Sequence, residues 1–190
     1  MAYNSSATKA RLLDAAYSEF ALRGFAGARV EKMAKEAGAN KQAIYLYFGS
    51  KEGLFDAVLE DRIGVLADQV RYTPDDLVGY TGALFDHLVR HGDLVRLTLW
   101  KMLERPEAAE LEVKSHVSKA EALAHQLGID ASSGMDVLML ILAMAQAWTT
   151  TSAAVRSMGD ESEHRLRQHR DALMSAVAAV IDTAGVPSPA

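Results

Sequence analysis

The sequence contains no cysteine and only four prolines in 190 residues. Without cysteine it can form no disulfide bond, thiolate nucleophile or cysteine-ligated zinc site. It also lacks an apolar run of roughly 20 residues, the length that a membrane-spanning helix needs; the most apolar run, residues 137–145, is far shorter. The first twenty residues lack the apolar core of a signal peptide. We therefore expect a soluble, cytoplasmic protein with no membrane partner.

The common motifs of catalysis are missing as well. There is no Gly-x-Ser-x-Gly turn, no His-Glu-x-x-His pair and no glycine-rich phosphate loop. His87 and His91 have the four-residue spacing of metal ligands on a helix, but no carboxylate of obvious partner spacing accompanies them, although Asp86 is adjacent. We predict no catalytic residue, no metal and no cofactor, so an enzyme is the disfavoured reading.

Net charge is unevenly distributed along the chain. The overall charge is −5, but residues 1–53 hold eight basic and five acidic side chains, a balance of +3. The remaining residues hold 12 basic and 20 acidic side chains, a balance of −8. A basic N-terminal part with an acidic remainder is compatible with binding a polyanion through the N-terminal part, although a balance of this size does not establish it.

Apolar residues recur at helical spacing, and no segment shows the sustained alternation of a strand. We predict an all-α chain with a polar loop at residues 128–134 and a disordered tail at residues 186–190. Pro74 and several glycines interrupt the apolar pattern and set the expected helix ends. The expected helices span residues 8–23, 30–37, 41–48, 51–72, 75–91, 93–105, 107–127, 135–158 and 161–184.

The segment Val30–Phe48 has the features of a helix-turn-helix. Gly38 suits the left-handed position after a first short helix, and Asn40 is a good N-cap for a second. Ile44 and Phe48 lie four residues apart and can pack against the first helix. In such a motif the second helix enters the DNA major groove. The residues left on or near its outer side are Lys41, Gln42, Ala43, Tyr45, Leu46 and Tyr47.

Residues 8–62 resemble the DNA-binding domain of the TetR family of transcriptional regulators. The matching segments are ARLLDAAYSEFALRGFAG (10–27) and VEKMAKEAGANKQAIYLYFGSKEGLFDAVLE (30–60), of which AIYLYFGSKEGLF is the most specific. The resemblance implies a three-helix DNA-binding domain over residues 1–50 and a larger helical domain for ligand binding and dimerisation over residues 51–185. It also implies a homodimer that binds a palindromic operator in double-stranded DNA, most simply as a repressor.

The resemblance also implies roles for individual residues. Lys41 and Gln42 would face base edges, and Ala43 would face a thymine methyl group. Tyr45 would pack on the backbone or a thymine methyl, Tyr47 would reach a phosphate unless it only supports the motif, and Lys51 would contact the backbone. The chain departs from the family at Ala28, where a Thr or Ser usually caps the second helix. Arg29 is then the candidate for a compensating phosphate contact. The expected DNA-binding residues are Arg29, Lys41, Gln42, Ala43, Tyr45, Leu46, Tyr47 and Lys51.

Aromatic and methionine side chains on the later helices are candidates for a pocket that binds a small apolar or aromatic effector, with plain core packing as the alternative. The expected ligand-binding residues are Tyr80, Phe85, Trp100, His116, Met139 and Trp148. By resemblance, the helices at 135–158 and 161–184 would form the dimer interface. Two other functions stay open: a regulator that activates without an effector, and a helical interaction protein of the same fold that has lost specific DNA binding.

Overall fold

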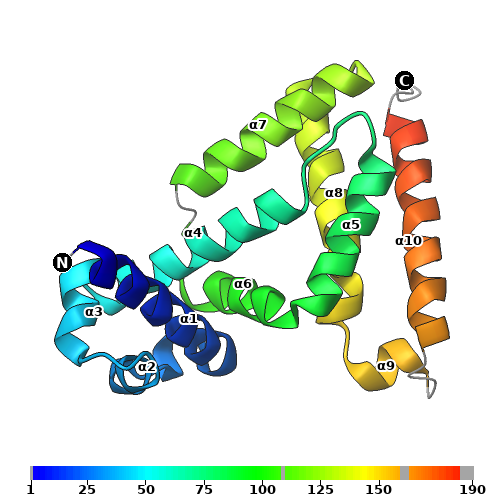
Figure 1. Ribbon diagram of the computed structural model, residues 1–190. Coiled ribbons are helices and arrows are strands. Elements are labelled where there is room, and N and C mark those ends of the chain that lie inside the picture. Colours follow the sequence, from blue (N-terminus) through cyan, green and yellow to red (C-terminus); the bar gives the residue numbers. More distant parts are fainter. Residues whose placement is uncertain (1, 108–109, 159–162, 185–190) are drawn as a thin grey trace. The chain divides into compact units, whose positions relative to one another are not determined.

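The computed structural model describes residues 2–107, 110–158 and 163–184 (Figure 1). Within these residues the secondary structure consists of α-helices without a strand, so the predicted all-α class is confirmed. The helices form two compact units. The first comprises residues 1–69 and 92–107, and the second comprises residues 70–91 and 108–190.

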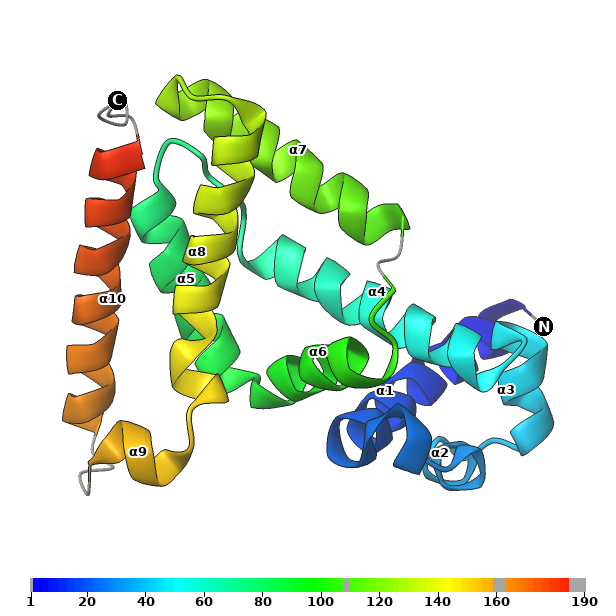
Figure 2. The ribbon, with the colours of Figure 1, turned by 180° about the vertical axis from the view of Figure 1, so that it is seen from behind.

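The first unit is built from five helices around one apolar core (Figures 1 and 2). Phe20 and Phe55 are fully buried, with ring centroids 4.9 Å apart in an edge-to-face arrangement. Each such side chain contributes about 1.5–3 kcal/mol through burial. Met33 and Ile44 extend this core to the two short helices. The helices are α1 (Ala2–Gly27), α2 (Val30–Glu36), α3 (Lys41–Phe48), α4 (Lys51–Gln69) and α6 (Gly92–Glu104).

The ends of α1 and α4 differ from the expected ones. Helix α1 begins at Ala2, earlier than the expected residue 8, and its regular part ends at Gly24, where φ is 70° and ψ is 179°. This confirms that Gly24 stops the helix, because a positive φ of this kind favours glycine. Helix α4 ends at Gln69 instead of residue 72. Since Pro74 excludes helical geometry at the preceding residue, the chain leaves the helix before it.

The second unit contains five further helices in the described residues, and four of them pack around its own core. Phe85, Leu138 and Leu173 are buried in it and come from three different helices, which lie side by side in Figures 1 and 2. Arg170 donates two hydrogen bonds to the Asp86 carboxylate, at 2.9 and 3.0 Å, and so joins two of these helices. The helices are α5 (Leu77–Arg90), α7 (Glu110–Leu127), α8 (Ala131–Thr150), α9 (Ala153–Ser157) and α10 (Glu163–Ala184).

The predicted loop at 128–134 is wrong. Gly128, with φ of 67°, ends α7, and α8 begins at Ala131. The Asp130 carboxylate caps α8 by accepting hydrogen bonds from the backbone N–H groups of Ser132 and Ser133 at 2.9 and 3.0 Å. Polar residues that resembled a linker are therefore the N-cap and first turn of a helix.

The single helix expected at 135–158 is wrong as well. Helix α8 ends at Thr150, Thr151 and Ser152 are extended, and α9 follows. The Thr149 and Thr150 hydroxyls donate to the Gln146 carbonyl, at 2.9 Å each. Side-chain bonds of this kind compete with the helical ladder, which accounts for a break in a run of three threonines.

The compact units also differ from the expected domain boundary at residues 50 and 51. Helix α4 packs on α1 and α3, and α6 packs on α1, so both helices cluster with the N-terminal residues. Spacing along the chain does not reveal such contacts because α6 is distant from α1 in sequence. The expected disordered tail at 186–190 lies outside the described residues.

Helix α8 is long and apolar enough to cross a bilayer by length and composition alone, among the helices of the described residues. The buried core helix of a soluble protein has the same signature. Val137, Leu138 and Ile141 of α8 are buried against α5, α7 and α10. Packing within the unit thus accounts for the apolar residues on this face of α8.

Candidate nucleic-acid interface

The turn between α2 and α3 has the backbone that the sequence predicts. Gly38 has φ of 63°, and Ala39 N–H donates to the Ala34 carbonyl at 2.9 Å, which closes the end of α2. The Arg11 guanidinium of α1 donates to the Ala37 carbonyl at 3.0 Å. Arg11 therefore caps the C-terminal end of α2.

Helix α3 is fixed by a side-chain cap and one buried residue. The Asn40 carboxamide oxygen accepts a hydrogen bond from Ala43 N–H at 2.8 Å, which confirms the predicted N-cap. Ile44 is fully buried and anchors α3 in the core. This arrangement fixes which side chains of a two-turn helix face outward.

The outward side of α3 carries most of the predicted contact residues. Leu46 is 81% exposed and Tyr45 is 44% exposed. Lys41 and Gln42 are exposed, whereas Ala43 is half-buried. These side chains therefore form an accessible surface with a cation, an amide, a phenol and an apolar tip.

Tyr47 differs from the other predicted residues of α3 because it is half-buried and packs on Phe48, with ring centroids 6.2 Å apart. Part of its role is therefore to support the helix. Lys51 is half-buried, with its ammonium 4.9 Å from the centroid of Phe25 and 3.5 Å from the Ala26 carbonyl. Ser50 caps α4 by accepting a hydrogen bond from Gly53 N–H at 3.0 Å.

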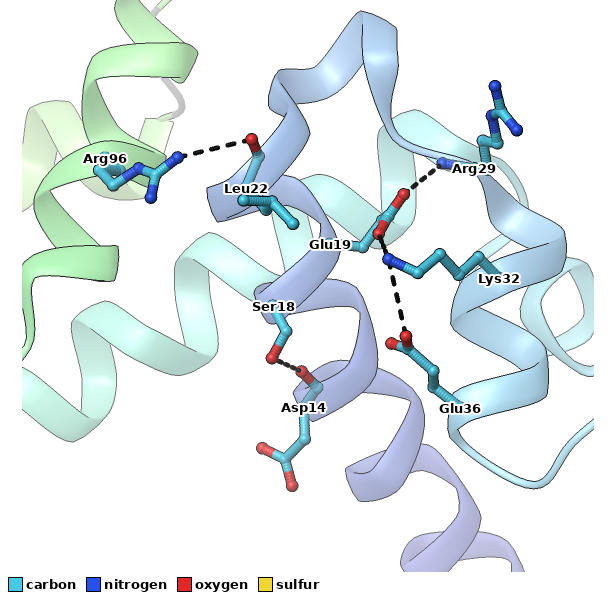
Figure 3. A network of polar contacts seen from close by, with 8 residues as sticks. All are labelled: Asp14, Ser18, Glu19, Leu22, Arg29, Lys32, Glu36 and Arg96. Atoms are coloured by element: carbon cyan, nitrogen blue, oxygen red, sulfur yellow. Dashed lines mark hydrogen bonds and ion pairs between the residues drawn. The ribbon is translucent and has the colours of Figure 1, made fainter.

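The α2 N-terminus, where the sequence lacks a hydroxyl cap, is capped from α1 instead (Figure 3). The Glu19 carboxylate is buried and accepts hydrogen bonds from Arg29 N–H at 3.3 Å and from the Lys32 ammonium at 2.6 Å. The Arg29 side chain points away from this network and is exposed. Burial opposes the charged form of Glu19, but the hydrogen bonds from Lys32 and Arg29 outweigh it, so its pKa lies below the usual value.

Helix α6 supports the C-terminal end of α1. The Glu104 carboxylate accepts a hydrogen bond from Ala26 N–H at 2.9 Å. Arg96 donates to the Leu22 carbonyl at 3.5 Å (Figure 3). Arg105 pairs with the Asp56 carboxylate of α4 at 2.8 Å. Polar groups on α6 and on Arg105, the residue after it, therefore hold the end of α1 and part of α4. The domain boundary predicted from the sequence places α6 in the larger domain at residues 51–185.

Comparison with known proteins agrees with this geometry. Residues 12–58 match the family described as bacterial regulatory proteins, tetR family, and residues 76–178 match the tetracyclin repressor-like C-terminal domain. The chain belongs to the TetR family. It is therefore a DNA-binding transcriptional regulator and not an enzyme, as predicted.

Individual relatives match along nearly the whole chain. The HTH-type transcriptional repressor SCO4008 of Streptomyces coelicolor is 36% identical over 95% of this chain and 98% of its own. The structure of the transcriptional regulator SCO4942 from Streptomyces coelicolor is 34% identical, covers 90% of this chain and 97% of its own, and superposes with a TM-score of 0.77. A TetR-like regulator from Rhodococcus sp. RHA1, 22% identical, covers 92% and 96% with a TM-score of 0.64 and shares the fold.

Two of the predicted TetR-type effector residues come together in the second unit. Phe85 and Trp148 both contact the His169 ring, with centroids 5.7 and 5.0 Å away. Tyr80 is buried and packs edge-to-face on Tyr72 at 5.1 Å.

The other predicted effector residues lie apart from this cluster. Trp100 belongs to α6 in the first unit, and its ring would lie 2.9 Å from a Cβ atom placed on Gly24. Met139 is 59% exposed on α8. His116 is half-buried, and its Nδ1 lies 2.8 Å from the Glu112 carbonyl. Trp100 was grouped with the pocket because helical periodicity shows which face is apolar but not which unit it packs in.

The histidine pair of α5 was the one metal candidate in the sequence. His87 and His91 stack on each other with ring centroids 4.3 Å apart, and the neighbouring Asp86 binds Arg170. Within the described residues, no group of three potential ligands is arranged to hold a metal ion.

The residues that sequence reasoning missed are those that hold the helix-turn-helix in place. One signal was available for Glu19, since it lies on the same face of α1 as Leu12, Ala16 and Phe20, all of which are buried. An acid on a buried face needs a partner, so its position suggested a nearby cation. No comparable signal exists for Glu31, which pairs with Lys41 across the turn, because both are exposed.

Proposed function

We propose that this TetR-family regulator is a repressor that binds a palindromic operator as a homodimer. The observation that carries the proposal is the accessible face of α3, with Lys41, Gln42, Tyr45 and Leu46 on a helix that Asn40 caps and Ile44 anchors in the core. Lysine and glutamine recognise guanine and adenine edges in the major groove, and an exposed ring or leucine can contact a thymine methyl group. The relative SCO4008, which has nearly the same length, is named a repressor, and this supports repression over activation.

Two-fold symmetry follows from the size of the recognition helix. Eight residues of α3 read only a few base pairs, whereas two copies about 34 Å apart can read successive major grooves. Helix α8 exposes Met139 and Leu140, and α10 exposes Ala172, Ala176 and Ala179, small residues that permit close helix packing. We propose that α8 and α10 form the dimer interface, in place of the expected ranges 135–158 and 161–184.

A small effector would release the operator by changing the relation between the two units. The chain leaves the first unit directly after α4, returns to it at the start of α6 and leaves it again at residue 107. Both α4 and α6 pack on α1 in the first unit. A ligand that prefers one conformation of the second unit would shift the population of the whole chain toward it. The aromatic cluster around His169, with Phe85 and Trp148, is the proposed location for an apolar or aromatic effector. Cytoplasmic localisation follows from the proposed role in transcription.

The proposed DNA surface is tested by footprinting genomic fragments captured by the full-length protein, with Tyr45→Ala in parallel. We expect a protected palindrome with the parent protein and a loss of affinity of roughly 30-fold or more with Tyr45→Ala, because the ring is 44% exposed on the outer face of α3 and can contact a base there. Circular dichroism checks that the variant is folded.

Two results would contradict the proposal. Unchanged operator affinity in folded Tyr45→Ala would remove this residue from the interface. A parent protein that protects no fragment at low salt would instead favour the interaction-protein alternative. The matched control is Leu103→Ala, a change on α6 of a side chain that is 75% exposed, which should leave the footprint intact.

A further inference from the structure

The only basic residue of α3 is held by an acid of α2. The Lys41 ammonium lies 2.5 Å from the Glu31 carboxylate and 5.9 Å from the centroid of the Tyr45 ring. Both partners of the ion pair are exposed, with side-chain exposures of 48% and 68%. The positive charge that the proposed DNA surface would present is therefore partly neutralised within the protein itself.

The position of Lys41 on α3 explains why the Glu31 carboxylate lies beside it. Lys41 is the first residue of α3, where the helix dipole disfavours a cation. Glu31 offsets this repulsion, and the ion pair also ties the two helices of the motif across their turn. A phosphate or base acceptor could replace the carboxylate, but only after the ion pair is broken.

We propose that Glu31 is a specificity-determining residue that keeps Lys41 from binding the phosphates of arbitrary DNA. Non-specific binding depends on how many phosphates the protein neutralises. An operator that places a guanine edge or phosphate at Lys41 compensates for the lost ion pair, whereas a random duplex does so poorly. Glu31 therefore lowers non-specific affinity more than operator affinity. This inference rests on the proposed DNA-binding function.

The same helix provides a matched control. Glu36 is an exposed acid of α2 that pairs with Lys32 at 3.7 Å. Lys32 is held independently by Glu19 at 2.6 Å, so Glu36→Gln removes one negative charge without releasing a lysine. Glu31→Gln removes the same charge and does release one. The two variants separate the effect of Lys41 from a general change in net charge.

The experiment measures binding of full-length protein to a random-sequence duplex by fluorescence anisotropy across a salt series. We expect Glu31→Gln to bind this duplex about 3- to 10-fold more tightly at low salt, with a slope of log K against log salt steeper by about 0.9 for each phosphate gained. Glu36→Gln should have the parent slope. Affinity for the footprinted operator should rise less, so the ratio of operator to random affinity should fall.

The gain must also depend on Lys41. The double variant Glu31→Gln/Lys41→Ala should have neither the tighter binding nor the steeper slope. Equal slopes for Glu31→Gln and Glu36→Gln in a protein that binds DNA would overturn this inference alone, as would a gain that persists without Lys41. Failure of the parent and of Glu31→Gln to bind any duplex at low salt would overturn the proposed function together with it.

Discussion

Glu19 shows how one buried carboxylate can replace a missing helix cap. It is 2% exposed, and its two oxygens bind Arg29 N–H and the Lys32 ammonium. Removing it leaves a backbone donor at the start of α2 without this partner and separates Lys32 from α1. Because α2 has only seven residues, it depends on such contacts more than on its intrinsic helix propensity.

We expect Glu19→Gln to destabilise the first unit by about 1–2 kcal/mol at pH 7, toward the lower value because Lys32 is half-exposed. Since the folded-state pKa of Glu19 is depressed, its contribution is present above the unfolded-state pKa of about 4.3 and is lost as pH falls through the folded-state pKa. The difference between parent and variant should therefore shrink below about pH 4. The difference in unfolding free energy is measured by urea unfolding in a Trp148→Phe background, where Trp100 fluorescence reports on the first unit.

Glu36→Gln serves as the comparison, because Glu36 is exposed and lies farther from Lys32 than Glu19 does. It should change stability by less than about 0.5 kcal/mol. If Glu19→Gln and Glu36→Gln have the same stability at pH 7, the capping role of Glu19 is wrong.

At the scale of elements, the sequence predicts helices most reliably where local chemistry decides them. Asn40 and Gly38 act through their own backbone neighbourhood, and each has the predicted role. The break at Thr151 and the position of α6 were missed for a different reason. The first depends on side-chain bonds that compete with the helix, and the second depends on contacts between residues far apart in the chain.

Two glycines with opposite surroundings test how closely α1 and α6 pack. Gly24 has φ of 70°, and an added Cβ would lie 2.9 Å from the Trp100 ring. Gly64 lies within α4 and has no atom within 4 Å of an added Cβ. We expect Gly24→Ala to destabilise the first unit by about 1–3 kcal/mol, and Gly64→Ala to stabilise it by about 0.5–1 kcal/mol.

The same urea unfolding with Trp100 fluorescence measures both changes. Trp100 lies against Gly24, so its emission should also change in folded Gly24→Ala and not in Gly64→Ala. Equal stabilities for the two variants would contradict the close packing of α6 against the end of α1.

At the scale of the whole molecule, the sequence predicted the functional class more fully than it predicted the contacts of individual residues. The segment from Lys41 to Lys51 identified the DNA-binding class because its side chains and spacing are specific. The assignment of effector residues stays a prediction, because an apolar face looks the same whether it lines a pocket or a core. Trp100 illustrates this, since its apolar ring packs in the first unit and not with Phe85 and Trp148.

The second unit should lose stability in mildly acidic solution. His169 on α10 lies between Phe85 of α5 and Trp148 of α8, and its buried Nε2 has no hydrogen-bond partner among the described residues. Burial and the nearby charge of Arg165 lower the pKa of His169. Since the unfolded state then takes up a proton at higher pH than the folded state, stability is full above about pH 6.5 and falls as pH decreases below it.

We expect thermal unfolding followed by Trp148 fluorescence, in a Trp100→Phe background, to occur at lower temperature at pH 5.5 than at pH 7.5. His169→Phe keeps an aromatic ring between Phe85 and Trp148 but cannot titrate, so it should reduce this difference. A smaller dependence should remain, because burial also lowers the pKa of His87. If His169→Phe has the full pH dependence of the parent, protonation of His169 does not limit the stability of the second unit. The acid sensitivity would then be assigned to His87.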